Sequence, residues 1–323
     1  MRARLLDTVL DRLVVPGYSS LGMAIRRPGW TDPAPDALAG RTVVVTGANS
    51  GLGKATVAGV VALGGAVEMV VRDARKGDRA RREVLDAVPD AEITVAVCDL
   101  SDLADARRYA ADLRGRRDAI FGLVHNAGVL PSQRSESPQG HELTLATHVL
   151  VPFLLTRELR GLLAAGAEPE DPARVVFVSS GGMYTASLRS DDPEFRGGRY
   201  SGGAAYARTK RMQVVLAEML GEELGRDPVV VHSMHPGWAD TPGVADSMPG
   251  FHRVVGPLLR TSEQGADTVV WLLAAREPGR ATGRFWHDRA PRPTHWLPWG
   301  YDTPGQRRAL WELCRLAEES VRD

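Results

Sequence analysis

The sequence predicts an α/β fold, a doubly wound parallel sheet covered by helices on both faces, and two observations carry this prediction. Six short apolar segments alternate with helical stretches from residue 41 onward, which is typical of parallel strands joined by helices. The first segment runs directly into a glycine-rich turn and a helix, the order of elements that holds nucleotide phosphates. Ligands of such sheets bind beyond the carboxyl ends of the strands, so the residues after each strand are the candidates for a site.

Runs of β-branched and apolar residues predict where the strands lie. They are expected at Thr42–Val45, Val67–Val71, Ile93–Cys98, Ile120–His125, Val175–Ser179 and Val229–Met234. We expect a single dinucleotide-binding domain with an integral substrate pocket over residues 39–290. A helical extension over 1–38 precedes it, and a tail helix within 291–323 follows it.

The two ends of the chain carry their own helical patterns. In the extension, leucine and valine recur at helical spacing up to Val14, and Pro16–Gly17 is expected to end this helix. We expect it to pack on the main domain or on a partner subunit, the alternative being a helix at a membrane surface or along a substrate channel. The tail helix is expected to start near Thr303 and to cover the pocket mouth or pack on a partner subunit. A homo-oligomer is compatible with both patterns.

Composition limits the class of protein and its partners. The chain has 323 residues, of which 43% are hydrophobic and 25% charged, enough for a globular core. Forty basic residues balance forty acidic ones, so the basic excess typical of nucleic-acid binding is lacking. The two cysteines, Cys98 and Cys314, exclude a disulfide framework and a cysteine metal site and fit a reducing cytoplasm.

Two further classes are not indicated. The first apolar run is interrupted by charges, unlike a signal peptide, and no stretch approaches the roughly 20 apolar residues that span a bilayer. A cytoplasmic protein without a transmembrane segment is therefore expected, with peripheral membrane contact left open. Four histidines fall in the candidate regions without a metal-ligand spacing, so we expect no metal: His148, His235, His252 and His287.

The glycine-rich turn after the first strand is the candidate pyrophosphate site. Glycines let the backbone approach a ligand without Cβ clashes, and the following helix directs free N–H groups and its positive dipole end at the same place. The residues that would line the phosphates are Gly47, Asn49, Ser50, Gly51, Leu52 and Gly53. An ordinary glycine-rich connection is the alternative.

The residue after the second strand bears on the choice of cofactor. Arg72 comes first at this position, and a guanidinium group suits a ribose 2′-phosphate by charge and by bidentate geometry. This favours NADP(H) over NAD(H). Asp73 is the alternative, because a small register shift would bring its carboxylate to a ribose 2′-hydroxyl and make NAD(H) the cofactor.

Small and polar residues follow the third and fourth strands. Asp99, next to Leu100, can accept from an adenine amino group or can cap a helix that starts at Ser101. After the fourth strand, Asn126, Ala127 and Gly128 are small enough for a ribose to lie against them.

The fifth and sixth strands lead to groups that can move protons. Tyr206 and Lys210 are four residues apart and share a helix face. A nearby ammonium group favours a phenolate and is expected to lower the pKa of the tyrosine, so that Tyr206 can exchange a proton with an alcohol or carbonyl. A serine hydroxyl from the pair after the fifth strand can hold the same oxygen. Pro236 and Gly237 make a turn, beyond which Thr241 can close over a cofactor.

Together these motifs resemble the short-chain dehydrogenase/reductase family over roughly residues 40–290. The stretches TGANSGLG, NAG at 126–128, the serine after the fifth strand, YARTK at 206–210 and HPG at 235–237 follow in that family's order. The resemblance implies a Rossmann fold and a bound nicotinamide cofactor. It also implies that Tyr206 is the general acid/base, that Lys210 binds the nicotinamide ribose, and that Ser180, rather than Ser179, orients the substrate oxygen.

The resemblance assigns the remaining cofactor contacts to the residues already named. Arg72 would take the 2′-phosphate, Asp99 the adenine and Asn126 the adjoining ribose. Thr241 would touch the carboxamide or the phosphates, beyond the turn at Pro236 and Gly237.

One departure from the family pattern lies in the helix expected over 142–156. The family's asparagine, which bends this helix and holds a water of the proton relay, is replaced by His148, and Pro152 removes an N–H four residues later. His148 could relay protons itself, the relay could be broken, or the ring could be satisfied by its surroundings.

The regions after Ser180 and after Pro236 are expected to shape the substrate pocket. They hold apolar and aromatic residues: Met183, Tyr184, Leu188, Phe195, Trp238, Met248 and Phe251. These favour a lipophilic carbonyl or alcohol, unless they only pack the segments onto the fold. The main hypothesis is an NADP(H)-dependent oxidoreductase. The alternatives are an epimerase or dehydratase on the same scaffold, and a nucleotide-binding regulatory protein with little turnover.

Overall fold

The computed structural model of the chain describes residues 7–8, 10–240, 256–296 and 301–322, and these contain one sheet of eight strands. The spatial order is β3-β2-β1-β4-β5-β6-β7-β8, with all neighbours parallel except β7 and β8. The strands are β1 (Thr42–Thr46), β2 (Ala66–Val71), β3 (Ile93–Val97), β4 (Gly122–His125), β5 (Ala173–Val178), β6 (Val229–Met234), β7 (Arg284–His287) and β8 (Ala290–Arg292). The doubly wound parallel sheet and all six predicted strands are confirmed; β7 and β8 were not predicted.

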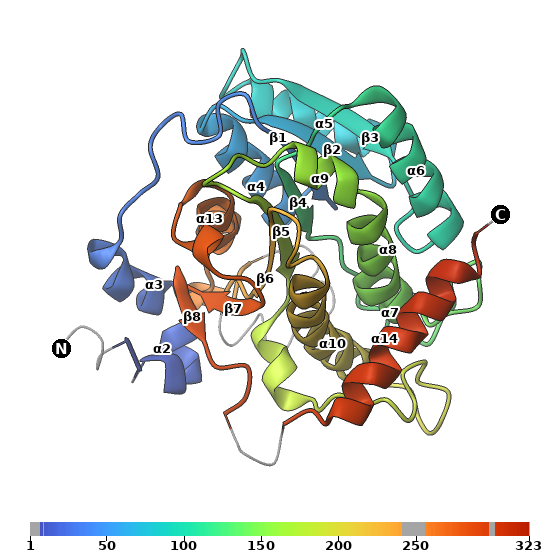
Figure 1. The fold of residues 1–323 in the computed structure, drawn as a ribbon. Coiled ribbons are helices and arrows are strands. Elements are labelled where there is room, and N and C mark those ends of the chain that lie inside the picture. The colour runs from blue at the N-terminus through green and yellow to red at the C-terminus, as the bar shows by residue number, and fades with distance from the viewer. Residues whose placement is uncertain (1–6, 9, 241–255, 297–300, 323) are drawn as a thin grey trace.

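The strands alternate their side chains between two cores. In β1, Val44 belongs to one hydrophobic cluster, whereas Val43 and Val45 belong to the other. Figure 1 shows helices on both sides of the sheet. One core lies under α4 (Gly51–Ala62), α5 (Ala74–Leu85) and α13 (Ser262–Ala274). The other lies under α6 (Leu103–Arg116), α8 (Val151–Glu158), α10 (Gly202–Glu223) and α14 (Pro304–Glu319).

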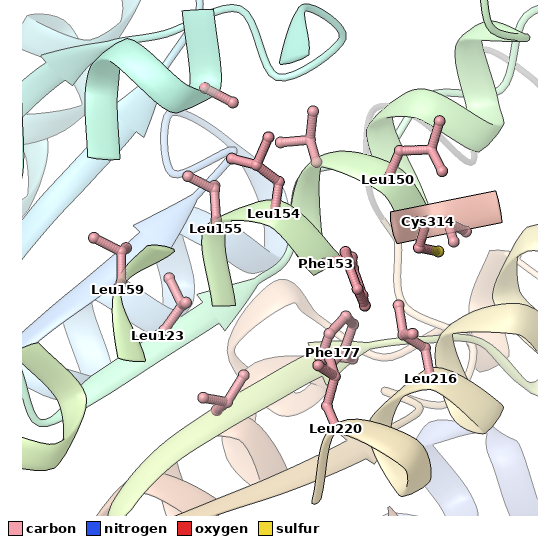
Figure 2. Packing of buried hydrophobic residues seen from close by; sticks show 14 of the residues in the cluster. Leu123, Leu150, Phe153, Leu154, Leu155, Leu159, Phe177, Leu216, Leu220 and Cys314 are labelled. Atoms are coloured by element: carbon pink, nitrogen blue, oxygen red, sulfur yellow. The ribbon is translucent and has the colours of Figure 1, made fainter. Parts of the chain in front are cut away.

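The second core is built from leucine and phenylalanine side chains of strands and helices far apart in sequence. Figure 2 shows Phe177 of β5 between Phe153 of α8 and Leu220 of α10. Cys314 of the tail helix packs into the same cluster. The tail helix α14 begins at the predicted place, because Thr303 and Gln306 form a capping box at its start. It packs on its own chain's α8 and α10.

The shorter helices connect these elements. They are α7 (Leu143–Leu145), the π-helical η2 (Ala146–Leu150), α9 (Arg160–Ala165), η3 (Gly181–Thr185), η4 (Gly256–Leu258) and η5 (Pro278–Arg280). No helix within the described ranges has both the length and the apolar character needed to cross a bilayer.

The extension forms α2 (Val14–Tyr18), α3 (Ser20–Arg26) and η1 (Arg27–Gly29). The prediction that Pro16–Gly17 ends a helix is wrong. Pro16 lies in the first turn of α2, where its missing N–H costs no hydrogen bond, and the chain breaks instead at Leu13, which is extended.

A buried ion network ties the extension to the sheet. Asp288, just after β7, accepts hydrogen bonds from Arg26 of α3 at 2.7 Å and from Arg260 at 2.9 Å. Arg292 of β8 binds Asp7 at 2.8 Å. Both arginines that contact Asp288 are less than a tenth exposed. Water cannot solvate these charges, so the arginines and the carboxylate compensate one another. The extension is therefore fixed against the edge of the sheet.

Two strand histidines are buried in the neutral form, and this makes the fold sensitive to acid. Nε2–H of His125 donates to Thr156 at 2.9 Å, and Nε2–H of His232 donates to the Pro278 carbonyl at 2.9 Å. Burial lowers the pKa of His125 to about 3 and that of His232 to about 4. The unfolded chain binds protons at these positions from about pH 6.5 downward, whereas the folded chain does not.

We therefore predict that these histidines make no unfavourable contribution to the free energy of unfolding above pH 6.5, and that this free energy falls as the pH drops toward 4. Each such histidine contributes about 1.4 kcal/mol per pH unit in this window. Urea unfolding between pH 7 and 4.5 measures the slope. His125→Phe removes one titrating ring and should make the slope shallower by about 1.4 kcal/mol per unit. An unchanged slope would show that His125 does not titrate on unfolding.

Candidate functional site

A cavity of about 650 Å³ lies at the carboxyl edge of the parallel strands. Sixteen of the predicted cofactor residues line it: Gly47, Asn49, Ser50, Gly51, Leu52, Gly53, Arg72, Asp99, Leu100, Asn126, Ala127, Gly128, Tyr206, Lys210, Pro236 and Gly237. Ser180 lines it too, whereas His148 is not among its lining residues. Thr241, Met248, Phe251 and His252 lie outside the described residues. One cavity thus joins the predicted nucleotide segments to the predicted catalytic ones.

The glycine turn after β1 is too tightly packed for side chains. Gly47 has a φ of 64°, and a Cβ there would lie 2.8 Å from the Ala127 Cα. A Cβ on Gly53 would lie 2.3 Å from the Gly47 carbonyl oxygen. Glycine at these positions lets the turn, the start of α4 and the loop after β4 pack together around the cavity.

The start of α4 leaves its N–H groups to the cavity. Its N-cap, Ser50, makes no side-chain capping bond. In contrast, Asp73 caps α5, Asp102 caps α6 and Ser201 caps α10 with their side chains. The first turn of a helix has N–H donors without intrahelical partners and a positive dipole end. Lined by Ser50, Gly51 and Gly53, this part of the cavity fits an anionic pyrophosphate.

The two residues after β2 have different surroundings. Arg72 is exposed and lines the cavity. The Asp73 carboxylate accepts from the Lys76 N–H of α5 at 3.1 Å, and hydrogen bonds of this kind hold the pKa of Asp73 below its usual value. Asp73 is thus engaged as a helix cap, and the guanidinium group is the charged side chain of this pair that faces the cavity.

The residues after β3 show that Asp99 is not a helix cap, which was one of the two roles expected for it. The helix α6 begins at Leu103 rather than Ser101, and Asp102 caps it by accepting from Ala104 and Asp105 N–H groups. The Asp99 carboxylate accepts from both the N–H and the hydroxyl of Ser101, at 3.0 and 2.7 Å. Asp99 and Ser101 therefore form a local turn at the cavity wall, and neither of them caps α6.

The loop after β4 is fastened to the glycine turn. The Asn126 side-chain amide donates to the Thr46 carbonyl at 2.9 Å and to the Gly47 carbonyl at 3.3 Å. The Thr46 hydroxyl accepts from the N–H groups of Asn126 and Ala127. The sequence assigned Asn126 to a ribose; in the structure its amide N–H groups join two walls of the cavity.

The groups expected to move protons lie together in the wall of the cavity. The Ser180 hydroxyl is near enough to the Tyr206 phenol to lower its pKa. Lys210 Nζ lies 5.4 Å from the centre of the Tyr206 ring. Ser179 instead donates its hydroxyl to the Lys210 carbonyl at 2.8 Å. Of the two serines, Ser180 is therefore the one beside the phenol.

The pKa values of this group differ from the sequence expectation. Burial raises the pKa of Tyr206, and the hydrogen bond from Ser180 offsets part of that rise. Burial lowers the pKa of Lys210 to about 7. The expectation that the pKa of Tyr206 is lowered is not met in this geometry, because desolvation of the buried phenol raises it. Tyr206 is accordingly a neutral phenol that can give up a proton.

His148 has a supporting position behind the cavity wall. Its Nε2 accepts from the Val129 N–H at 2.9 Å, so its Nδ1 carries the proton and donates to Thr209 at 2.9 Å. Burial and the charge of Lys210 hold the pKa of His148 well below its usual value. With both nitrogens bonded and the ring neutral, the expectation that His148 relays protons is not supported. The ring instead fixes the loop after β4 against α10.

The helix that carries His148 does not follow a regular α pattern. Residues Ala146–Leu150 are π-helical, and α8 starts again at Val151 with Pro152 in its first turn. A proline there has no N–H to bond back to the preceding turn, and a π-helical segment accommodates the change of register. The helix is thus irregular where Pro152 was expected to interrupt its hydrogen bonds, and the irregularity takes the form of a local π-helix.

The apolar residues after Ser180 mostly pack the fold. Met183 and Leu188 are buried in hydrophobic clusters and do not line the cavity. Tyr184 stacks on Trp296 of the tail with ring centres 4.1 Å apart, and donates to the Pro293 carbonyl. Their packing within the fold is the alternative that the sequence left open. Trp238, which the sequence assigned to the pocket, does line the cavity, together with Leu130 and Leu143.

Sequence reasoning missed Gln213 and the role of the extension. Gln213 lies one helical turn after Lys210 and bonds to it, a spacing that the sequence already shows. In the extension, the Tyr18 carbonyl accepts from the Trp238 N–H at 2.8 Å, and the Tyr18 ring lies against Gly181. No periodicity in the sequence indicates that the extension makes these contacts. Within the described residues, no group of three His, Cys, Asp or Glu side chains is arranged for a metal.

The account of His148 predicts the effect of removing its ring nitrogens. His148→Leu leaves the Val129 N–H and the Thr209 hydroxyl without this partner, and should lower the free energy of unfolding by about 2–4 kcal/mol. His148→Gln retains one donor and one acceptor and should lose less. Urea unfolding at pH 7 measures both. Equal, small losses would contradict a supporting role.

Comparison with known proteins gives a consistent result. A family model described as short chain dehydrogenase matches residues 41–250. The human dehydrogenase/reductase SDR family member 12 is 37% identical over 285 residues, 88% of each chain. Bovine retinol dehydrogenase 12 is 32% identical over 78% of each chain. A Beutenbergia cavernae protein described as an NAD(P)-dependent gluconate 5-dehydrogenase, solved with bound NADP, superimposes with a TM-score of 0.63. Its identity is 27%, with 79% of this chain and 97% of that one covered.

Proposed function

Because the chain belongs to the short-chain dehydrogenase family, we propose that it is an NADP(H)-dependent oxidoreductase that interconverts a lipophilic carbonyl compound and its alcohol. One observation carries the proposal. The Ser180 and Tyr206 hydroxyls share a single cavity with the glycine turn and the start of α4. A nicotinamide dinucleotide can lie along that cavity and end at the phenol.

The cavity wall supports NADP(H) as the cofactor. The uncapped start of α4 and the glycines at 47 and 53 leave donors and space for the pyrophosphate. Arg72 supplies a guanidinium group for a 2′-phosphate, and Asp73 is occupied as a helix cap. A relative in the same fold was solved with NADP. NAD(H) would lack the group that Arg72 binds.

Proton transfer falls to Tyr206. When bound, the cofactor supplies the hydride. Tyr206 is neutral at neutral pH because burial raises its pKa, so its hydroxyl can donate a proton to the carbonyl oxygen as that oxygen gains negative charge. The Ser180 hydroxyl can hold the same oxygen and orient it. Lys210 lines the cavity beside the phenol and, in its charged form, stabilises the phenolate that remains.

The substrate class rests on the lining. Leu130, Leu143 and Trp238 present apolar surface to the cavity, which favours a substrate with an apolar body around one oxygen. Bovine retinol dehydrogenase 12, a relative whose name identifies a lipophilic alcohol, is compatible with this class. The fixed contact between Tyr18 and Trp238 suggests that the extension helps to shape this end.

The same proposal includes the organisation of the chain. The extension over 1–38 and the tail over 291–323 act as additions to a dinucleotide-binding domain over 39–290, in keeping with the ion network around Asp288 and with the packing of α14 on α8 and α10. A cytoplasmic location agrees with two buried, free cysteines.

The direct experiment is NADPH consumption with a panel of aldehydes and ketones of increasing apolar size. We predict turnover that Tyr206→Phe reduces by at least about a hundredfold, because the ring stays and only the proton donor is lost. Binding of NADPH should be nearly unchanged. If the variant retained turnover, Tyr206 would not be the acid.

Other outcomes would favour the other hypotheses. Tight NADPH binding without reduction of any carbonyl would favour a nucleotide-binding regulatory protein. Product formed without a net change in the cofactor would favour an epimerase or dehydratase on this scaffold.

A second prediction concerns cofactor choice. Arg72→Ala removes the guanidinium group and should weaken NADPH binding about ten- to hundredfold, the effect of losing a charge-assisted hydrogen bond. NADH binding should hardly change. The matched control is Arg75→Ala, which removes an exposed arginine outside the cavity lining. Equal losses for NADPH and NADH in Arg72→Ala would exclude recognition of the 2′-phosphate.

A further inference from the structure

The surroundings of Lys210 contain a side chain with no assigned role. Lys210 is 3% exposed, and its ammonium group donates to the Val178 carbonyl at 2.7 Å and to Gln213 Oε1 at 3.1 Å. These bonds use two of its three N–H donors. The third is left for the cavity, which Lys210 lines.

Gln213 is fully buried and uses both ends of its amide. While Oε1 accepts from Lys210, Nε2 donates to the His148 carbonyl at 2.9 Å. The reverse orientation would place an NH₂ group against an ammonium group and an oxygen against a carbonyl, so the two partners fix the amide in one orientation. A residue needed only to fill space would not require this match.

The His148 carbonyl suits this bond because of the irregular helix. In a regular α-helix it would accept from the residue four positions later, but that residue is Pro152, which has no N–H. The π-helical segment lies against α10, and Gln213 of that helix donates to this carbonyl. Pro152 therefore leaves the His148 carbonyl available to accept from Gln213.

We propose that Gln213 is a positioning residue for Lys210: its amide links the ammonium group to the His148 carbonyl and so holds the lysine charged and directed at the cavity. In this arrangement a side chain connects the lysine to the π-helix. The amide oxygen favours the ammonium form by hydrogen bonding to it. The geometric link stands by itself, whereas its catalytic meaning rests on the proposed function.

A consequence follows for the charge of Lys210. Burial alone lowers the pKa of Lys210 to about 7, so its charge at neutral pH is finely balanced. A lost acceptor would shift the lysine toward the neutral amine. The neutral amine stabilises neither the phenolate of Tyr206 nor the bond to a ribose hydroxyl as well as the ammonium group does.

The chain allows this charge to be measured without a substrate. It contains three lysines, Lys54, Lys76 and Lys210. In protein carrying ¹³C at the lysine Cε, three signals are expected, and Lys210→Arg identifies the third by its loss. Lys54, paired with Glu83 on the surface, and Lys76 serve as internal references. The titration of each Cε shift with pH gives the pKa directly.

The test compares Gln213→Leu and Gln213→Glu with the wild type. Gln213→Leu keeps the bulk and removes the acceptor, so the Lys210 midpoint should fall by about one pH unit, a tenfold loss in proton affinity. Gln213→Glu keeps the shape and places a carboxylate there, so the midpoint should rise by at least about one unit. Thr156→Val, which loses a buried hydroxyl bonded to the Pro152 carbonyl, is the control and should leave the Lys210 midpoint unchanged.

Unchanged Lys210 midpoints in both Gln213 variants would overturn the proposal. A shift in Thr156→Val as large as that in Gln213→Leu would also overturn it, because general destabilisation would then be the cause. If Gln213→Leu does not fold, Gln213→Glu still decides the result. The titration needs no turnover. It therefore tests the role of Gln213 even if the protein proves to have no oxidoreductase activity. Where activity is present, the pH profile of kcat should shift with the Lys210 midpoint, and KM should change little.

Discussion

The buried ammonium group of Lys210 is the constraint on which the site depends. A buried cation is costly unless its donors are partnered. Here the end of β5 supplies the Val178 carbonyl, and α10 supplies Gln213 one turn further along the helix that carries the lysine. Tyr206, Lys210 and Gln213 follow one another at spacings of four and three residues on one face of α10. Anchoring the lysine therefore also fixes where the phenol lies.

The irregular helix before α8 belongs to the same arrangement. The His148 ring, neutral and bonded through both nitrogens, holds the loop after β4 against α10. The carbonyl of the same residue receives the Gln213 amide. One residue thus supports the loop after β4 with its ring and, through Gln213, the lysine with its backbone. Both ring nitrogens are bonded within the fold, in keeping with the proposal that Tyr206 transfers the proton.

Much of the fold and of the cavity lining could be predicted because it follows from local patterns. β-branched runs marked the six strands, and because parallel strands end at one edge, the residues after them had to meet. Glycines 47 and 53 are required by close backbone approach, which the sequence motif reflects. The short β7 and β8 escaped prediction, since four and three residues carry too little periodicity to be distinguished from a loop.

The error at Pro16 has a local origin, because the first turn of a helix tolerates a proline. The other differences come from long-range packing: the tail residue Trp296 covers Tyr184, which local sequence could not reveal. Whether His148 relays a proton depended on its partners, Val129 and Thr209, which lie 19 and 61 positions away. The raised pKa of Tyr206 likewise reflects its burial, which the spacing from Lys210 in the sequence does not reveal.

The central claim is that one cavity accepts a nicotinamide dinucleotide whose reactive end lies beside Tyr206 and Lys210. The most direct measurement is a titration of the purified protein with NADPH, followed by the fluorescence of the nicotinamide. The account predicts saturable binding at one site per chain, with enhanced fluorescence as the ring leaves water for the apolar lining. Absence of saturable binding would contradict the account, because the glycine turn, the start of α4 and Arg72 would then serve no nucleotide.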